Sequence, residues 1–274
     1  MARYELDDES YRCLAMISTL ASYKLATSDL SRTIQRVSDQ PTVAREVAYY
    51  EENISKVKTI EEFIDDTRLF NFAMQAHGLG EMSYAKAFMK KVLVEGRDAR
   101  DSFANSLTDK RYLEFAETFD FYRYGETATT FTKARQGTVE KYLRQTLEEQ
   151  AGDENEGVRL ALYFQRKAPT ITSYYGILAD PALGQVVRTA IGLPDSVGSI
   201  DIDKQVEMMK DRIDLEEFSD PAALEKFLER FTTLWEVNNG SATAQSSGIG
   251  LLYNQGATFG ISQDLMLQIQ QLKR

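Results

Sequence analysis

The side chains that most often carry catalysis or bind metals are scarce in this chain, which has one histidine, His77, and one cysteine, Cys13. A zinc site draws several ligands from Cys and His, and a nucleophilic thiol needs a base beside it. His77 stands directly before Gly78 at the expected end of a helix, where a polar ring suits the helix dipole. We therefore predict no catalytic residue and no metal site.

Carboxylates and glycine-rich segments are the other candidates for chemistry. Paired carboxylates can act as acid and base in glycoside hydrolysis or bind a divalent metal. Most acidic pairs here stand at expected helix starts or on polar faces, which predicts solvated side chains; they are Asp7-Asp8, Glu51-Glu52, Asp65-Asp66, Glu148-Glu149 and Asp201 with Asp203. Gly248-Ile249-Gly250 lacks the preceding strand and the following Gly-Lys-Ser/Thr of a phosphate loop, so we predict no cofactor.

Composition and charge argue against further classes of function. A net charge of −10 and a pI near 4.9 would repel a phosphate backbone, so we expect no nucleic-acid partner. No apolar run approaches the ~20 residues of a membrane span. The first residues are acidic where a cleaved signal peptide would be basic. These features predict a cytoplasmic protein, or one exported without a cleaved signal.

Helices are the elements expected to position these side chains. Five prolines in 274 residues and many strong helix formers predict an all-α fold. The clearest helix runs from Asp66, an N-cap, to Gly78, a left-handed residue at the C-terminal end. Its cap, apolar face and stop recur 114 positions later, from Asp180 to Gly192. Similar elements follow in both places, which predicts two diverged copies of one multi-helix unit.

Breaks between helices divide the chain into five predicted parts. Asp39-Gln40-Pro41 ends the first helical segment, because a residue before proline is pushed out of the α region. A helix from Thr127 to Gln150 is expected to join the two units, with its end at Ala151-Gly152-Asp153. The parts are an N-terminal helical arm (1–40), a first helical unit (41–125), the connecting helix (126–152), a second helical unit (153–237) and a mobile tail with a flexible linker and a short C-terminal helix (238–274).

Several stretches together resemble the alphaproteobacterial domain-of-unknown-function family 1217, over about residues 20–274. They are Gln40-Pro41-Thr42-Val43-Ala44-Arg45-Glu46, Asn53-Ile54-Ser55-Lys56-Val57-Lys58, Phe103-Ala104-Asn105-Ser106-Leu107, Asn155-Glu156-Gly157-Val158-Arg159-Leu160-Ala161-Leu162 and Ala179-Asp180-Pro181-Ala182-Leu183. The resemblance implies no reaction and no functional residues. Members of the family are encoded among flagellar genes of rhizobia and their relatives, so the resemblance implies a flagellar context.

Two apolar stretches are predicted to bind a partner, because an amphipathic helix can dock into a groove through such side chains. They are Leu14, Ile17 and Leu20 near the N-terminus, and Leu265, Ile269 and Leu272 near the C-terminus. We predict a non-enzymatic helical protein that serves flagellar assembly or function by binding flagellar or other proteins, or by forming a homo-oligomer. The alternatives are a cytoplasmic export chaperone with an open apolar groove, and an enzyme with a carboxylate and tyrosine site between the two units.

Overall fold

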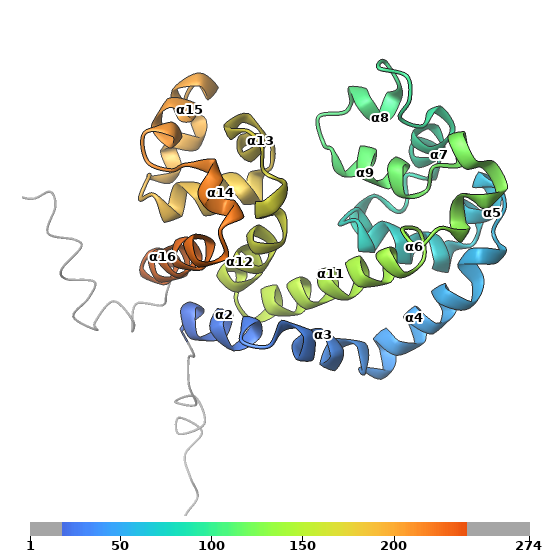
Figure 1. Ribbon diagram of the computed structural model, residues 1–274, viewed down its shortest axis with the longest axis horizontal. Helices are drawn as coiled ribbons and strands as arrows, with labels where there is room; N and C mark the ends of the chain where they lie inside the picture. The colour runs from blue at the N-terminus through green and yellow to red at the C-terminus, as the bar shows by residue number, and fades with distance from the viewer. Residues whose placement is uncertain (1–17, 240–274) are drawn as a thin grey trace, which may run out of the picture.

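A computed structural model describes residues 18–239, and helices are the only regular secondary structure in that range. The prediction of an all-α fold is confirmed. Two lobes lie on the same side of a long helix, α11 (Gln136–Glu154), which runs beneath the first lobe and reaches the second (Figure 1).

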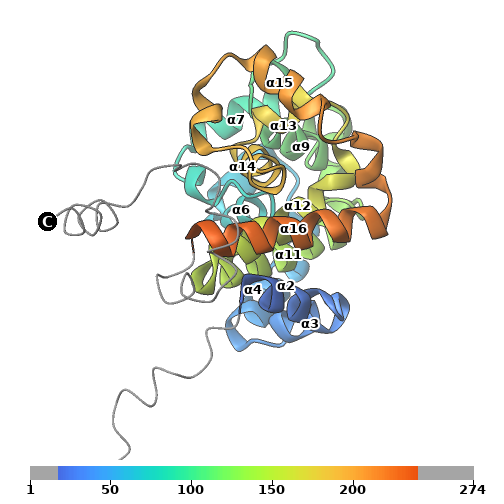
Figure 2. The ribbon, with the colours of Figure 1, turned by 90° about the vertical axis from the view of Figure 1, so that its left-hand side faces the viewer.

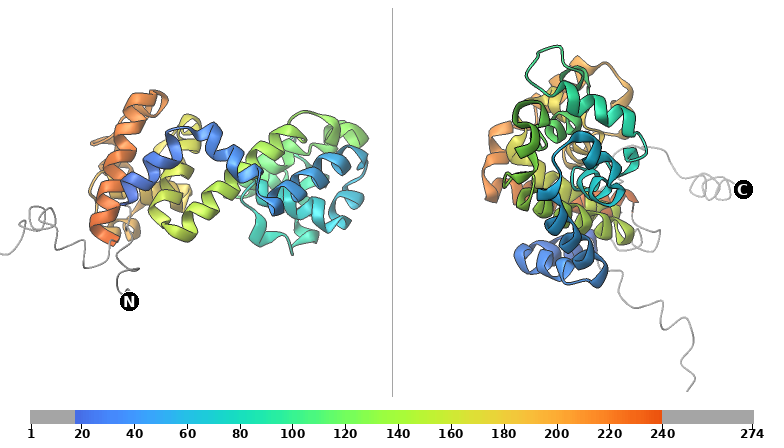
Figure 3. Two further views of the ribbon diagram at one scale, coloured as in Figure 1. Left: turned by 90° about the horizontal axis from the view of Figure 1, so that it is seen from below. Right: turned by 90° about the vertical axis from the view of Figure 1, so that its right-hand side faces the viewer.

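The first lobe is formed by residues 41–130, before α11, and the second by residues 156–239, after it. The first contains α4 (Pro41–Asn53), η1 (Ile54–Lys56), α5 (Ile60–Asp65), α6 (Thr67–Ala76), η2 (Gly80–Met82), α7 (Lys86–Glu95), α8 (Phe103–Ser106), α9 (Arg111–Thr118), α10 (Phe121–Tyr124) and η3 (Gly125–Thr130). The second contains α12 (Glu156–Lys167), η4 (Ala168–Thr170), α13 (Tyr174–Ala179), α14 (Pro181–Ala190), η5 (Asp195–Ser199), α15 (Ile202–Lys210), η6 (Leu215–Ser219) and α16 (Pro221–Asn239). Two further helices, α2 (Thr19–Thr27) and α3 (Leu30–Ser38), run from the second lobe toward the first (Figure 3).

Local signals set the helices of the first lobe, and aromatic side chains pack them together. Thr59 and Glu62 form a capping box at the start of α5. Asp66 caps α6 by accepting two backbone N–H bonds. The space between α5, α6 and α9 is filled by fully buried rings, those of Phe63, Phe70, Phe115 and Phe119. Because these rings come from three helices, their burial fixes the helices against one another.

Part of the second lobe matches the first at a constant offset. α4, η1, α5 and α6 end 114 positions before α12, η4, α13 and α14, respectively. In each lobe a tyrosine hydroxyl donates to the carboxylate that caps the next helix, from Tyr49 to Asp66 and from Tyr163 to Asp180. Two positions after the end of each capped helix stands a glycine with positive φ, Gly78 or Gly192. The caps and stops therefore agree with the sequence pattern, whereas the duplication of two complete units stays a prediction.

The connecting helix begins and ends later than the sequence predicted. Residues 125–130 form a 3-10 helix, and α11 starts only at Gln136. The hydroxyl of buried Thr129 donates to the carbonyl of Val57 at 2.7 Å, which holds this segment against the first lobe. Gly152 does not end the helix. A Cβ there would lie 2.6 Å from the Arg159 side chain, so this glycine instead permits close packing of α11 on α12.

Helices α2, α12 and α16 meet at one corner of the second lobe (Figure 2). The backbone N–H of Thr19 donates to the Glu236 carboxylate on α16 at 2.9 Å, and the Thr19 hydroxyl donates to the same oxygen. Gly157 on α12 lies against the indole of Trp235, where a Cβ would be only 2.3 Å from the ring. The described chain therefore begins and ends at neighbouring points.

Candidate functional site at the junction of the lobes

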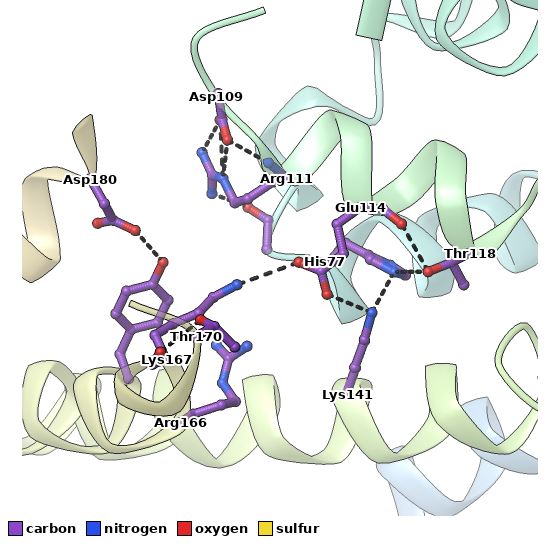
Figure 4. Close-up of polar contacts among 12 residues, drawn as sticks. His77, Asp109, Arg111, Glu114, Thr118, Lys141, Arg166, Lys167, Thr170 and Asp180 are labelled. Atoms are coloured by element: carbon purple, nitrogen blue, oxygen red, sulfur yellow. Dashed lines mark hydrogen bonds and ion pairs between the residues drawn. The ribbon is translucent and has the colours of Figure 1, made fainter. Parts of the chain in front are cut away.

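Four ionisable side chains from four helices converge where the two lobes face each other (Figure 4). His77 follows α6 and Glu114 lies on α9, both in the first lobe. Lys141 lies on α11, and Lys167 is the last residue of α12 in the second lobe. We call these four residues the junction cluster. Helix packing brings them together across 90 positions of sequence, since α11 contacts both α6 and α12.

The ring of His77 is buried, with 7% of its surface exposed, and its two nitrogens have different partners. Nδ1 lies 2.9 Å from the carbonyl oxygen of Ala73, so Nδ1 carries the proton and donates it. Nε2 then accepts from the ammonium group of Lys141 at 3.1 Å. Burial and the neighbouring charge of Lys141 lower the pKa of His77 to about 3. The imidazole is therefore neutral at physiological pH.

Glu114 binds two lysines that come from different parts of the molecule. Its Oε1 is 2.7 Å from Nζ of Lys141, and its Oε2 is 3.4 Å from Nζ of Lys167. Burial opposes ionisation of Glu114, but the charges of Lys167 and Lys141 outweigh burial and lower its pKa to about 2. Burial lowers the pKa of Lys141, while its bond to Glu114 acts in the opposite direction. The first lobe, α11 and the second lobe are thus joined through one carboxylate.

A second ion cluster lies between α11 and α12. Glu148 is 2% exposed and accepts two hydrogen bonds of 2.7 Å from the guanidinium of Arg166. Arg144, one turn earlier on α11, donates to the same carboxylate at 3.4 Å. The prediction that Glu148 is solvated was wrong, because α12 packs over this side of α11 and supplies Arg166. Both charges on the buried side of α11 are paired, as burial of a charge requires.

The other polar groups at the junction also have partners within the chain. Tyr163 donates to Asp180 at 2.5 Å, and Arg111 donates to Asp109 at 2.7 Å (Figure 4). Arg111 also donates to the carbonyl of Gly78 at 2.5 Å. A general acid or base must reach a proton on a substrate, and each of these groups already has an internal partner. These hydrogen bonds and ion pairs link the helices and the two lobes. The alternative of an enzyme with a carboxylate and tyrosine site stays a prediction.

A surface depression of about 380 Å³ lies between α4, α6 and α11, and shares no residue with the junction cluster. Its lining mixes polar and aromatic side chains, namely Glu46, Thr67, Arg68, Asn71, Phe72, Gln75 and Tyr142. Within residues 18–239, no group of three or more His, Cys, Asp or Glu side chains is placed to hold a metal ion. None of the helices in that range is long and apolar enough to cross a bilayer.

One of the six predicted partner-binding residues lies in the described part of the chain. Leu20 is half-buried in α2, and this helix starts at Thr19 with Ser18 as its N-cap. The remaining five, Leu14, Ile17, Leu265, Ile269 and Leu272, lie outside the described residues. The prediction that these six residues bind a partner is therefore untested.

Sequence reasoning missed the charged residues of the junction, although α11 contains one signal of them. Arg144 and Glu148 are four residues apart, and each directly follows an apolar residue of the buried face, Leu143 or Leu147. That spacing places an ion pair at the edge of a buried helix face. Glu114 and Lys167 have no such signal, because they meet only after the lobes are packed.

The fold and its junction define a two-lobed, all-helical protein whose lobes are joined by buried and half-buried ion pairs. The family described as protein of unknown function (DUF1217) matches residues 76–224. The X-ray crystal structure of protein AGR_C_984 from Agrobacterium tumefaciens is similar to the chain, with 50% sequence identity and a TM-score of 0.75. This match covers 81% of the present chain and 94% of the Agrobacterium chain. The chain belongs to the DUF1217 family, and no curated protein matches it.

Proposed function

We propose that this chain is a non-enzymatic helical protein that serves flagellar assembly or function by binding other proteins through its two ends. The observation that carries the proposal is the corner at which α2, α12 and α16 meet. Thr19 and Glu236 link α2 to α16, so the first and last helices of the described chain meet at this corner of the body. This proximity supports the proposal that the two sequence segments with apolar residues at helical spacing engage one partner together.

The flagellar part of the proposal rests on the gene context that membership of the family implies. Axial proteins of the flagellum pack their N- and C-terminal helices together when they assemble. A body whose first and last described helices meet at one corner suits such joint packing. The ion pairs at the junction support a scaffold role, since Glu114 and Glu148 link separate helices and make the body that carries the ends more rigid.

The test is deletion of the gene from the bacterium that encodes it, followed by complementation with end variants. We expect the deletion to impair swimming and flagellar structure, and the intact gene to restore both. The variant Leu265→Asp/Ile269→Asp/Leu272→Asp should fail to restore swimming. The matched control Gln268→Asp/Gln270→Asp/Gln271→Asp adds the same charge to polar positions of the same segment and should restore it.

Localisation of a tagged chain separates the remaining outcomes. Association with the flagellum would support the proposal. A tagged chain that stays in the cytoplasm, in a bacterium whose deletion strain fails to export flagellar subunits, would favour the export chaperone. Normal swimming and normal flagella in the deletion strain would contradict both.

A further inference from the structure

The free end of the second lobe carries an unbalanced acidic surface. Residues 195–220 form η5, α15 and η6 and hold nine acidic and three basic residues, a net charge of −6 within a chain whose total is −10. All nine acidic residues are exposed. Within residues 18–239, none of the nine forms an ion pair with a lysine or arginine at 4.0 Å or less. Figures 1 and 2 show α15 at the end of this lobe that points away from α11.

The corresponding end of the first lobe pairs most of its charges internally. Lys90 on α7 pairs with Glu61 on α5 at 2.7 Å, and Arg97 pairs with Glu117 at 3.5 Å. Matching helices, α4 to α6 and α12 to α14, precede these ends in the two lobes. The fold therefore does not require the acidic residues at the end of the second lobe to lack ion-pair partners. Unpaired like charges repel one another, and a basic partner would relieve that repulsion.

Large apolar side chains lie exposed within this acidic surface. Ile202 and Met208 on α15 are 57% and 37% exposed, and Tyr175 on the adjacent α13 is 54% exposed. The Tyr175 hydroxyl donates to Asp203 at 2.8 Å, which places its ring beside the start of α15. α15 packs into the lobe through Gln205, Val206 and Met209, which leaves Met208 on its outer side and Ile202 exposed at its first turn. This exposed surface of α13 and α15, which we call the face of α13 and α15, therefore combines apolar side chains with a surrounding excess of carboxylates.

From this combination we propose that the face of α13 and α15 binds a basic segment of another protein, with apolar side chains on one side and lysines or arginines around them. The inference rests on the proposed function, because it gives the chemistry of one partner of the same protein-binding protein. Ile202 and Met208 supply apolar contacts, and the carboxylates attract the basic rim. The chain's own ends do not match this partner. Residues 240–274 contain only two basic residues, and residues 1–17 contain more acidic than basic residues.

The probe for this face is a fluorescein-labelled helical peptide of leucine and lysine, with leucines along one side, titrated against the full chain by fluorescence anisotropy. The charge variant is Glu207→Gln/Glu216→Gln/Glu217→Gln, which spares the helix caps of this lobe. The matched control is Glu51→Gln/Glu81→Gln/Glu140→Gln, three exposed acidic residues elsewhere with no ion pair in the described part of the chain. We expect the charge variant to weaken binding about tenfold. The control should weaken it by less than about twofold.

The apolar contacts are tested with two peptides. Ile202→Ser/Met208→Ser should weaken binding of the leucine–lysine peptide several-fold and leave binding of an all-lysine peptide unchanged. Tyr84→Ser removes a more exposed apolar side chain, 79% exposed in the first lobe, and should change neither. Circular dichroism establishes that each variant is folded.

Equal weakening of peptide binding by the two sets of glutamine substitutions would mean that the affinity depends only on the net charge of the chain. That result would overturn the assignment of this face. Equal effects of Ile202→Ser/Met208→Ser and Tyr84→Ser would do the same. The two proposals fail separately. A chain that is dispensable for swimming contradicts the flagellar proposal and leaves the peptide measurements unaffected, whereas equal weakening contradicts only the assignment of this face.

Discussion

Replacement of Gly157 by alanine tests the close packing of α2, α12 and α16 at the corner where the described chain begins and ends. A methyl group at this position would lie 2.3 Å from Cδ1 of Trp235 and 2.8 Å from Cγ2 of Thr19. Carbon atoms in favourable contact are about 3.5–4.0 Å apart. The substitution therefore forces α16 or α2 to move by about 1 Å, or the indole to leave its position.

The magnitude follows from two opposing effects. Extra volume in a well-packed site costs about 1–3 kcal/mol. Alanine in place of glycine within a helix recovers up to about 1 kcal/mol. We expect a net loss of about 1–2 kcal/mol in the free energy of unfolding, because the contact of 2.3 Å is with a rigid indole ring that packs against the core. The tie between Thr19 and Glu236 should loosen as well, since both flank the same contact.

The assay is urea-induced unfolding followed by circular dichroism, with Gly137→Ala as the matched control. Both glycines are the second residue of a helix, Gly157 in α12 and Gly137 in α11. The nearest atom to a Cβ at Gly137 is the carbonyl oxygen of Thr132, at an ordinary 3.5 Å. Gly137→Ala should therefore raise stability by up to about 1 kcal/mol.

Equal stabilisation by the two substitutions would refute the close packing at Gly157. Trp235→Leu supplies a second check, because removing the indole makes room for the methyl group. The double variant Gly157→Ala/Trp235→Leu should then lose less stability than the sum of the two single losses. Strictly additive losses would show that Trp235 is not the obstacle.

Two further predictions concern the junction. Glu148→Gln removes the carboxylate shared by Arg144 and Arg166 and should cost about 3–5 kcal/mol in urea unfolding, because buried charge is left uncompensated. Glu156→Gln breaks an exposed pair with Arg159 and should cost less than about 1 kcal/mol, so equal losses would contradict the burial argument. The pKa of His77 is about 3 in the folded chain, far below its ordinary value of about 6.5. Below about pH 6.5 the unfolded chain therefore binds one proton more than the folded chain, so the free energy of unfolding falls as the pH drops. The NMR signals of this single imidazole should not titrate near pH 6.5 while the chain stays folded. The substitution His77→Ile should make the free energy of unfolding depend less on pH between about pH 6.5 and 5. A titration midpoint near 6.5 would show that the ring is not buried and neutral.

The sequence by itself determined where many of the helices begin and end. Thr59 with Glu62, and Asp66, act as the caps that their positions predict, and Gly78 and Gly192 adopt positive φ. Such signals work within one helical turn, so they need no knowledge of the rest of the fold. The connecting helix was less predictable, because its start is held by the long-range bond from Thr129 to the first lobe.

Only the tertiary structure decided which polar groups meet and which are buried. Glu148 and Glu149 are neighbours in an acidic pair, but α12 covers the first and leaves the second exposed. Glu114 and Lys167 lie 53 residues apart and pair only because packing of both lobes on α11 brings the end of α12 to Glu114. Burial of a charge and the identity of its partner depend on helix packing between distant segments, which a pattern along one segment does not contain. The shared corner of α2 and α16 has the same origin, since it joins residues 217 positions apart.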